Sequence, residues 1–377
     1  MKKKPEKSKK VIVALSGGVD SAVAAALLKK QGYGITAVYF LFFDGARAAE
    51  IQVKKIAKKL DIPLKIVDAR KEFKKRVIDY FLDSYKKGLT PNPCVVCNKE
   101  MKFRMLFDLL KKYKSDFAAT GHYARIFRGT RNTEHGTKKS YKLQKAKDKN
   151  KDQSYFLYRL TQNDLAKIMF PLGDYEKKEV RKLAEKTGLP IQRKESQDIC
   201  FIENNDFGRF LKKNIKMLPG KVANRDGKTI GSHEGLAPYT FGQRRGIKIG
   251  PPASRREREA LRAGGPGPYF VLQKNMRKNI LVITNNPKDL LRKKFSLKKI
   301  SWIAEKPEFP MKAQVQIRYH SEKFSAIIKK TKKGKIEITS AKNLRAVTAG
   351  QSAVFFRGSE LLGGGVILPD YEVRIGH

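Results

Sequence analysis

The stretch VIVALSGGVDSAVAAALL, residues Val11 to Leu28, decides the fold of the N-terminal part of the chain. VIVAL is a short apolar run typical of a buried strand, and an alanine-rich helical segment begins after the polar turn SGGVDS. The glycine pair in this turn permits backbone angles that aim several N–H groups at one point, and the positive end of the following helix adds to them. We therefore predict a strand, an anion-binding turn and a helix.

Apolar runs and amphipathic segments alternate through the first half of the chain. This alternation predicts an α/β fold with a doubly wound parallel sheet, in which ligands bind at the carboxyl ends of the strands. A charged stretch at 128–152 is interpreted as a loop, and helical signals resume at 161–170 and 176–188. The strands are expected at 11–15, 35–40, 64–69 and 117–120, and the helices at 22–31, 48–60, 71–82 and 103–113.

Three domains are expected from changes in pattern along the chain. The α/β pattern ends near residue 203, so that 1–203 forms the first domain. Residues 204–278 contain one helical signal, Gly- and Pro-rich connectors and a very basic segment, and we interpret them as a small linking domain. From 279 to 377, short alternating runs separated by turn residues predict a C-terminal β-barrel.

The composition is strongly basic. Lys and Arg number 82 against 36 Asp and Glu, a formal charge of +46, which favours a polyanionic partner such as nucleic acid. The alternative is a lysine-rich composition with the charge spread over helix faces. The sequence contains no apolar run of membrane-spanning length and no secretion signal, so we expect a cytoplasmic protein without a membrane partner. Three cysteines are too few for a disulfide framework.

The SGGVDS turn is not one of the common nucleotide-binding loops, because the sequence contains neither GxxxxGK[ST] nor GxGxxG. Placed directly after a strand, it resembles the PP-loop of the ATP pyrophosphatase family, whose members split ATP between its α and β phosphates to adenylate a substrate. The resemblance implies that N–H groups of residues 17–21 grip pyrophosphate and that Asp20 helps to hold Mg²⁺. The alternative is a Gly-Gly turn in which Asp20 and Ser21 only cap the helix.

Further motifs extend the resemblance over nearly the whole chain. They are TPNPCVVCNKEMKF (90–103), ATGHYAR (119–125), KDQSYFL (151–157), FPLGD (170–174), ESQDICFI (195–202) and GQRRG (242–246). With SGGVDS they resemble the tRNA-specific 2-thiouridylase family. The resemblance implies an enzyme that adenylates the C2 oxygen of the wobble uridine in a tRNA anticodon loop. It then replaces that oxygen with persulfide sulfur from a sulfur-relay or cysteine desulfurase protein.

The same resemblance implies roles for the cysteines. Cys200 would carry the persulfide and Cys97 would attack it, which leaves a Cys97–Cys200 disulfide to be reduced. We expect the positive surroundings of a tRNA-binding cleft to lower the pKa values of these thiols. The residues alone leave other interpretations open: buried structural thiols, a Cys94–Cys97 redox pair, an iron–sulfur cluster on Cys94, Cys97 and Cys200, or zinc with His122 as fourth ligand.

The remaining site residues are carried over by position. Two departures stand out: Cys94 occupies a position where the family often has Asp, and Phe40 one where methionine is frequent, although Phe40 would act through its backbone. For His122 the alternative is an ordinary polar residue without a binding role. The implied ATP site comprises Ala14, Leu15, Ser16, Gly17, Gly18, Val19, Asp20, Ser21, Phe40 and Gly121. The implied tRNA contacts are Asn92, Pro93, Cys94, His122, Lys151, Asp152, Gln153, Arg318, Tyr319 and Gln351.

Two other functions stay open at this point. A different adenylating enzyme of the PP-loop family could act on a small molecule, but it would use neither the cysteines nor the charge. A non-catalytic RNA-binding protein could keep a degenerate nucleotide fold, although the intact SGGVDS argues against it. Cleavage of ATP would distinguish the enzymes from the binding protein.

Overall fold

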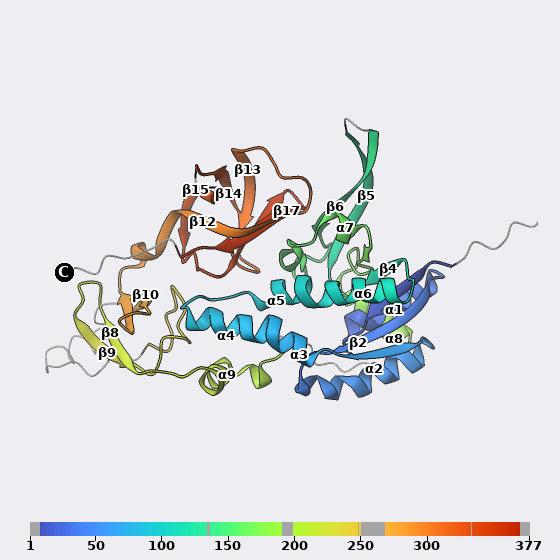
Figure 1. Cartoon of the computed structure of the whole chain (residues 1–377), viewed down its shortest axis with the longest axis horizontal. Helices are drawn as coiled ribbons and strands as arrows, with labels where there is room; N and C mark the ends of the chain where they lie inside the picture. The colour runs from blue at the N-terminus through green and yellow to red at the C-terminus, as the bar shows by residue number, and fades with distance from the viewer. Residues whose placement is uncertain are drawn as a thin grey trace, which may run out of the picture.

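The computed structural model describes residues 8–133, 136–190, 199–247, 249, 268–332 and 334–369. An α/β part with the N-terminal sheet lies at one end of the longest axis, and a small β part lies at the other (Figure 1). An antiparallel barrel built from the C-terminal strands lies to one side of the long helices that connect these two ends (Figure 1).

The N-terminal sheet has five parallel strands in the order β3-β2-β1-β4-β7. Side chains alternate along β1, so that Val11 and Val13 join the core on one face of the sheet and Ile12 joins the core on the other. The helices α1, α2 and α8 cover the first face and α6 covers the second, as the doubly wound prediction requires. The strands are β1 Lys10–Ala14, β2 Gly34–Leu41, β3 Leu64–Asp68, β4 Phe117–Ala119 and β7 Ile168–Met169, and the helices are α1 Val19–Lys30, α2 Arg47–Lys59, α6 Arg104–Lys112 and α8 Lys177–Lys186.

Two helical rods are longer than the sequence pattern predicts, and each contains a π-helical segment. The first runs through α3 Arg70–Phe73, η2 Lys74–Ile78 and α4 Asp79–Lys86. The second runs through α5 Pro93–Val96, η3 Cys97–Phe103 and α6. It begins ten residues before the predicted helix at 103–113, because Pro93 at the first helical position has the backbone angle that starts a helix. The CxxC motif therefore lies on a helix.

The charged stretch at 128–152 was predicted as a loop, and for most of its length this is wrong. β5 Ala124–Thr133 and β6 Gly136–Lys145 form a continuous antiparallel hairpin that projects from the α/β part (Figure 1). At its inner end Leu143 and Gln144 pair with the barrel strand β17, and Leu143 is fully buried, but most of the hairpin has no buried face. The alternation that marks a half-buried strand is therefore missing.

The predicted helix at 161–170 is also wrong over most of its length. Only α7 Gln162–Leu165 is helical, capped by a reciprocal pair of hydrogen bonds between Thr161 and Asp164. The apolar residues that follow form the short strand β7, which adds to the edge of the parallel sheet. Short 3-10 turns occur at η1 Asp44–Ala46, η4 Ser154–Leu157, η5 Glu203–Asn205 and η6 Pro287–Leu290.

The middle part of the chain packs α9 Phe207–Asn214 and a four-stranded sheet in the order β10-β11-β8-β9. Its strands are β8 Gly220–Ala223, β9 Thr229–His233, β10 Phe270–Asn275 and β11 Ile280–Thr284. Much of the basic segment at 242–269 that the sequence singles out lies outside the described residues. The domain boundaries at 203 and 278 stay a prediction.

The C-terminal strands form a closed antiparallel barrel, as predicted. Their order is β12-β15-β14-β13-β16-β17, and pairing of β12 with β17 closes the ring. The barrel core contains Val315, Ile328, Ile338 and Phe355, one from each of four strands. The strands are β12 Leu291–Trp302, β13 Met311–Gln316, β14 Phe324–Lys330, β15 Ile336–Arg345, β16 Ser352–Arg357 and β17 Glu360–Ile367.

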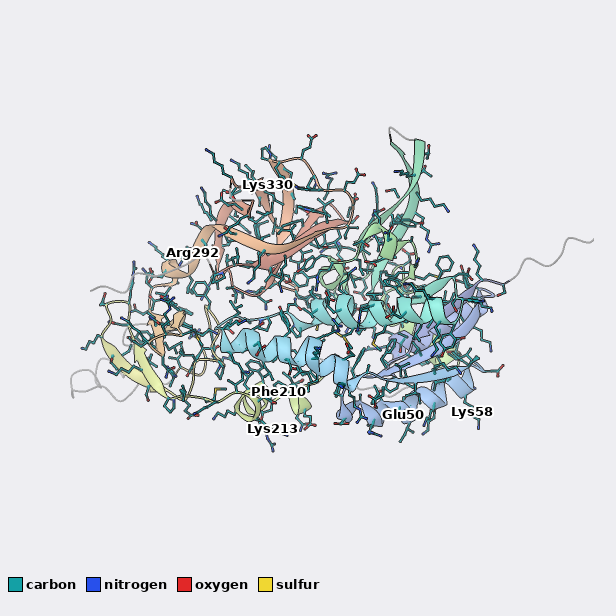
Figure 2. The ribbon with its side chains drawn as sticks, in the orientation of Figure 1. Glu50, Lys58, Phe210, Lys213, Arg292 and Lys330 are labelled. Atoms are coloured by element: carbon teal, nitrogen blue, oxygen red, sulfur yellow. The ribbon has the colours of Figure 1, made fainter. Side chains whose placement is uncertain are left out.

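Basic side chains are distributed over all three parts rather than confined to one. Figure 2 labels Lys58 on α2, Lys213 on α9 and Lys330 at the end of β14, and each is exposed. Within the described part of the chain, no helix is long and apolar enough to span a membrane.

Candidate active site

The SGGVDS turn lies between β1 and α1 at the carboxyl end of the central strand. Gly17 has a φ of +83°, which glycine adopts without strain. The Ser21 hydroxyl closes the turn, since it accepts from the Ser16 amide at 3.0 Å and donates to the Gly18 carbonyl at 3.1 Å. Gly18 is the N-cap of α1, and no side chain caps this helix end. The first-turn N–H groups of α1, which have no acceptor within the helix, thus face outward as an anion site.

Asp20 does not cap the helix but joins an ion pair with the distant Lys177. The Lys177 ammonium donates to both carboxylate oxygens of Asp20, at 2.7 and 2.8 Å, and the Tyr123 hydroxyl donates to one of them at 2.7 Å. The Lys177 side chain is 9% exposed and that of Asp20 is 35% exposed, so the carboxylate keeps an open side toward solvent. The interpretation of Asp20 as a simple cap is therefore wrong.

Gly121 is the residue that allows this arrangement to form. A β-carbon at position 121 would lie 2.7 Å from the Ser21 amide nitrogen and 2.8 Å from the Asp20 carbonyl carbon. Any larger residue would push the ATGHYAR segment away from the turn. Phe40 is buried at the end of β2, where its ring stacks on Phe42 in the second core, so its side chain has a packing role.

The fold brings the two cysteine motifs into one neighbourhood, although they are about a hundred residues apart in the chain. Cys94 is half-buried on α5, Cys97 is buried at the start of η3, and Cys200 is exposed; all three are free thiols. Cys97 packs in one apolar cluster with Phe201 and Ile202, the two residues after Cys200. The charge of Cys200 also acts on both Cys94 and Cys97.

The expectation that positive surroundings lower the thiol pKa values is wrong for this structure. Burial raises the pKa of Cys97 to about 12 and that of Cys94 to about 11, and desolvation also raises the pKa of Cys200. The ammonium of Lys102, which lies on η3 with Cys97, lowers all three pKa values. Its effect is smaller than that of desolvation, because an apolar cluster rather than an open basic cleft surrounds Cys97.

The alternatives that place a metal on these cysteines find no support in the geometry. In the residues that the structure describes, no group of three His, Cys, Asp or Glu side chains is arranged to hold a metal ion. His122, the fourth ligand considered for zinc, is buried between Phe103 and Phe170, with ring centroids 5.9 Å from each. Its Nδ1 lies 2.7 Å from the Thr120 hydroxyl, and burial lowers its pKa well below the usual value. His122 therefore has the environment of a neutral core residue.

The segment Asn92-Pro93-Cys94 is held at the junction of the α/β part and the barrel. The side-chain amide of Gln351 donates to the Thr90 carbonyl at 2.9 Å, and the backbone N–H of Thr90 donates to the Ala349 carbonyl at 2.9 Å. Gly350 packs so closely that a β-carbon there would lie 2.9 Å from the Thr90 oxygen. Gln351 thus positions the segment that precedes α5, and its predicted contact with tRNA stays a prediction.

Two further predicted tRNA segments face each other across the same junction. In the first, the Asp152 carboxylate is 8% exposed and accepts from the amides of Ala146 and Ser154, so it organises its own loop. Gln153 pairs with the backbone of Tyr123 in both directions.

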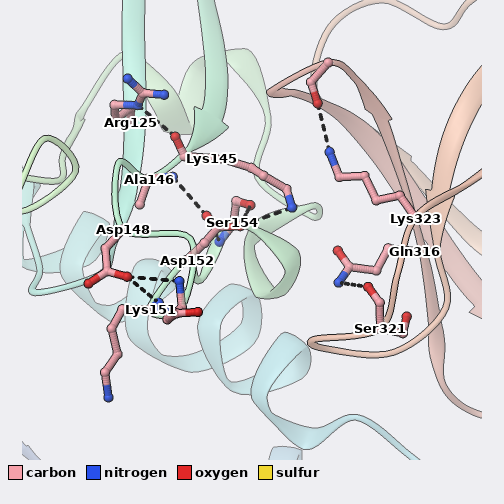
Figure 3. Close-up of polar contacts among 12 residues, drawn as sticks. Arg125, Lys145, Ala146, Asp148, Lys151, Asp152, Ser154, Gln316, Ser321 and Lys323 are labelled. Atoms are coloured by element: carbon pink, nitrogen blue, oxygen red, sulfur yellow. Dashed lines mark hydrogen bonds and ion pairs between the residues drawn. The ribbon is translucent and has the colours of Figure 1, made fainter. Parts of the chain in front are cut away.

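The side chain of Lys151 is half-buried, and its amide donates to Asp148 (Figure 3). From the barrel side, the Tyr319 ring packs on Phe156 at a centroid distance of 4.4 Å, and the exposed Arg318 donates to the Ala346 carbonyl.

Family models match three consecutive stretches of the chain. They are the tRNA methyl transferase HUP domain at 9–204, the tRNA methyl transferase PRC-barrel domain at 208–285 and the aminomethyltransferase β-barrel domain at 292–367. The tRNA-specific 2-thiouridylase MnmA 2 of Clostridium botulinum is 37% identical over 369 residues, which cover 95% of this chain and 98% of that one. The chain belongs to the tRNA-specific 2-thiouridylase family.

Other relatives agree with this 2-thiouridylase assignment. MnmA of Geobacillus thermodenitrificans is 37% identical over 380 residues, and that of Streptococcus thermophilus is 38% identical over 375 residues; each alignment covers at least 96% of both chains. Among solved structures, the U34-tRNA thiolase NcsA of Methanococcus maripaludis has 23% sequence identity and a TM-score of 0.34, and covers 52% of this chain and 62% of that chain. That score is too low to support any argument about shared chemistry.

Sequence reasoning about this 2-thiouridylase missed three residues that the structure places at the site. Tyr123 and Lys177 bind Asp20, and Lys102 acts on the thiols. Tyr123 lies within the ATGHYAR motif and Lys102 within the first cysteine motif, but the sequence alone assigns no function to either residue. Lys177 begins a helix whose sequence is rich in charge, and nothing in the sequence marks it as the one lysine turned inward.

The three thiols should differ sharply in reactivity. We expect iodoacetamide at pH 8 to modify Cys200 first and Cys97 last, at least about tenfold more slowly, because Cys97 is buried and its pKa is raised to about 12. Below the pKa, each rate should rise about tenfold per pH unit as the thiolate fraction grows. Peptide mass spectrometry after timed quenching measures the order, and unfolded protein provides the control in which all three react alike. Equal rates for Cys97 and Cys200 in the native protein would contradict this description of the site.

Proposed function

We propose that this 2-thiouridylase family member is an ATP-dependent tRNA sulfurtransferase that converts the wobble uridine of tRNA to 2-thiouridine. The observation that carries the proposal is that the α/β part contains an uncapped helix start behind a Gly-Gly turn, and that Cys97 in this part packs with the residues next to Cys200 from a distant motif. The first can bind the phosphates of ATP and the second can carry and release sulfur. An adenylating enzyme that acts on a small molecule would leave the thiols unused.

The residues of the turn fit a nucleotide phosphate and a magnesium ion. The N–H groups at the start of α1 can donate to pyrophosphate, and the open side of the Asp20 carboxylate can bind Mg²⁺. When bound, Mg²⁺ neutralises phosphate charge. The chain itself orients the turn through Ser21 and supports Asp20 through Tyr123 and Lys177. Adenylation makes AMP the leaving group at C2 of the uridine, because the unmodified C2 oxygen is a poor leaving group.

Sulfur transfer then needs both cysteines. A donor protein can load Cys200 because its side chain is exposed, which gives a persulfide, Cys200–S–SH. The terminal sulfur attacks C2 of the adenylated uridine, and AMP leaves as the new C–S bond forms. The Cys97 thiolate next attacks the Cys200 sulfur, so that the S–S bond breaks and the electron pair stays on the 2-thiouridine. The product pair is 2-thiouridine and a Cys97–Cys200 disulfide, which an external thiol reduces.

tRNA is proposed to bind at the junction of the α/β part and the barrel. Segments 92–94 and 151–153 lie on one side of this junction, and Arg318 and Tyr319 lie on the other. Arg and Lys side chains there can bind phosphates, and the aromatic rings can stack with bases of an unpaired loop. The formal charge of +46 supports a polyanionic substrate.

The test is nucleoside mass spectrometry on unmodified tRNA after incubation with the protein, ATP, Mg²⁺ and a persulfide donor. We expect 2-thiouridine at the wobble position, dependent on ATP, with AMP formed in step. A reaction without ATP and one with a tRNA that lacks a wobble uridine are the controls. If AMP forms but no thiolated base does, the protein is an adenylating enzyme and its proposed substrate, the wobble uridine, is wrong.

A further inference from the structure

Two lysines from different parts of the chain meet over one aromatic ring at the junction. Lys145 ends the hairpin strand β6, and Lys323 directly precedes the barrel strand β14. Their ammonium nitrogens lie 5.0 and 4.1 Å from the centroid of the fully buried Phe356 ring. Figure 3 shows both side chains reaching toward the gap between the α/β part and the barrel.

Negative charge around this lysine pair is scarce. The nearest carboxylate is Asp152, 3.8 Å from the Lys145 ammonium, and its oxygens already accept from Ala146 and Ser154. Lys323 donates only to the Gly358 carbonyl among the contacts that the structure describes, at 2.8 Å. Burial and, to a lesser extent, the neighbouring charge of Lys145 lower the pKa of Lys323 to about 8, against the opposing effect of Asp152. The two ammonium groups thus have one carboxylate between them, that of Asp152, and its oxygens already accept hydrogen bonds from Ala146 and Ser154.

A cavity of about 150 Å³ opens beside Lys145. Its walls come from both sides of the junction and carry cationic, hydroxyl, amide and aromatic groups together with the Asp152 carboxylate. Small-molecule sites usually occupy about 300–1,000 Å³, so this cavity has room for a phosphate group but not for a whole nucleotide. The lining residues are Lys145, Lys149, Asp152, Tyr155, Gln316, Tyr319, His320 and Ser321.

We propose that Lys145, which lines this cavity, and Lys323, which meets Lys145 over the Phe356 ring, clamp one backbone phosphate of the bound tRNA. The proposal rests on the proposed function, because it takes tRNA as the substrate. The phosphodiester supplies the negative charge that the lysine pair lacks, and the pair spans two parts of the chain, so binding also holds the hairpin against the barrel. Neither lysine belongs to the segments at 151–153 or 318–319.

The clamp makes tRNA affinity depend on pH in a defined direction. The groups facing Lys323 are Lys145 from β6, Asp152 from the following loop, the Gly358 carbonyl from the β16–β17 turn and the Phe356 ring. A bound phosphate favours the charged ammonium and so raises the pKa of Lys323 above its free value of about 8. Affinity should therefore be nearly constant up to about pH 7, be reduced about twofold at pH 8 and be reduced by up to about tenfold at pH 9.

The experiment measures tRNA dissociation constants by filter binding from pH 7 to 9 and over a range of salt. Lys323→Met keeps the stem over Phe356 but removes the charge. It should lose the decrease above pH 7 and reduce the salt slope by about one. Lys323→Arg stays charged and should bind at pH 9 as wild type does at pH 7. Lys330→Met, at the exposed far end of the strand that follows Lys323, is the matched control and should keep the wild-type pH profile.

Other outcomes overturn the clamp. If Lys323→Met and Lys145→Met both keep the wild-type pH profile and salt slope, the lysine pair does not bind tRNA. The proposed function would be unaffected by that result, because it is tested by thiolation with the wild-type protein. Inorganic phosphate alone is the second arm. If it stabilises the wild type against heat more than Lys323→Met without competing with tRNA, the site serves a free anion and the RNA assignment is wrong.

Discussion

Asp20→Asn should reduce AMP formation by about 100-fold to 1,000-fold while tRNA affinity stays within about twofold of wild type. Asparagine keeps the shape of the side chain and its ability to accept from Tyr123, but it lacks the charge that would bind Mg²⁺ beside the phosphates. tRNA binding should survive because Asp20 is not among the segments 92–94, 151–153 and 318–319 that are proposed to bind the RNA, and the loss of a negative charge does not weaken binding to a polyanion.

The ion pair with Lys177 offers a competing explanation for the same loss. Without Asp20 the ammonium of Lys177, 9% exposed, has lost its bidentate partner. Breaking a fully buried pair costs about 3–5 kcal/mol, and because Asp20 is 35% exposed we expect about 2 kcal/mol here. A purely structural role for Asp20 would therefore also lower activity, through a misplaced turn.

The double variant Asp20→Asn with Lys177→Met separates the two explanations. It removes both charges, so the free energy of unfolding, measured by urea denaturation, should recover most of the loss. AMP formation should stay at the level of the single variant, because no carboxylate has returned. Recovery of activity together with stability would show that Asp20 serves only as the partner of Lys177.

Local chemistry explains which parts of the site were predictable from the sequence. The SGGVDS turn is read correctly because all its determinants, from the strand to the unblocked helix start, lie within eighteen consecutive residues. The partner of Asp20 is not local: Lys177 lies 157 residues away, and its inward orientation depends on how α8 packs against α1. Similarly, the sequence names the three cysteines but cannot show that Cys97 packs into an apolar cluster that raises its pKa.

The fold follows the same rule. The barrel strands and most of the parallel strands bury at least one face, so their apolar pattern is visible in the sequence; the edge strand β3 is only partly buried. The hairpin β5–β6 is stabilised mainly by pairing of its own backbone, and its exposed strands carry charged side chains on both faces. Asp152 and Gln153 are expected to contact tRNA by resemblance, and their hydrogen bonds show that they also shape their own loop; the tRNA contact stays a prediction.

The cysteine substitutions should stop the transfer of sulfur to the uridine but not the preceding use of ATP to adenylate it. Cys200→Ser should form no detectable 2-thiouridine while AMP formation stays within about threefold of wild type, because a hydroxyl cannot carry a persulfide and the ATP site is separate. Cys94→Ser is the comparison variant: this thiol lies in the same neighbourhood but has no step in the transfer, so the variant should still form 2-thiouridine, with the rate lowered only as far as segment 92–94 binds tRNA less tightly.

Cys97→Ser should stop the reaction later than Cys200→Ser does. Without the Cys97 thiolate, the disulfide between the uridine sulfur and Cys200 has no internal attacker, so the tRNA should stay covalently attached. Denaturing gels should show a protein–tRNA adduct that dithiothreitol releases as thiolated tRNA, and Cys200→Ser should show none. The raised pKa of Cys97 implies that its step in wild type accelerates with pH, about tenfold per unit below pH 12, until another step limits the rate. If Cys97→Ser releases free 2-thiouridine at the wild-type rate, Cys97 has no part in the mechanism. The thiol that releases the product would then be Cys94 or an external thiol.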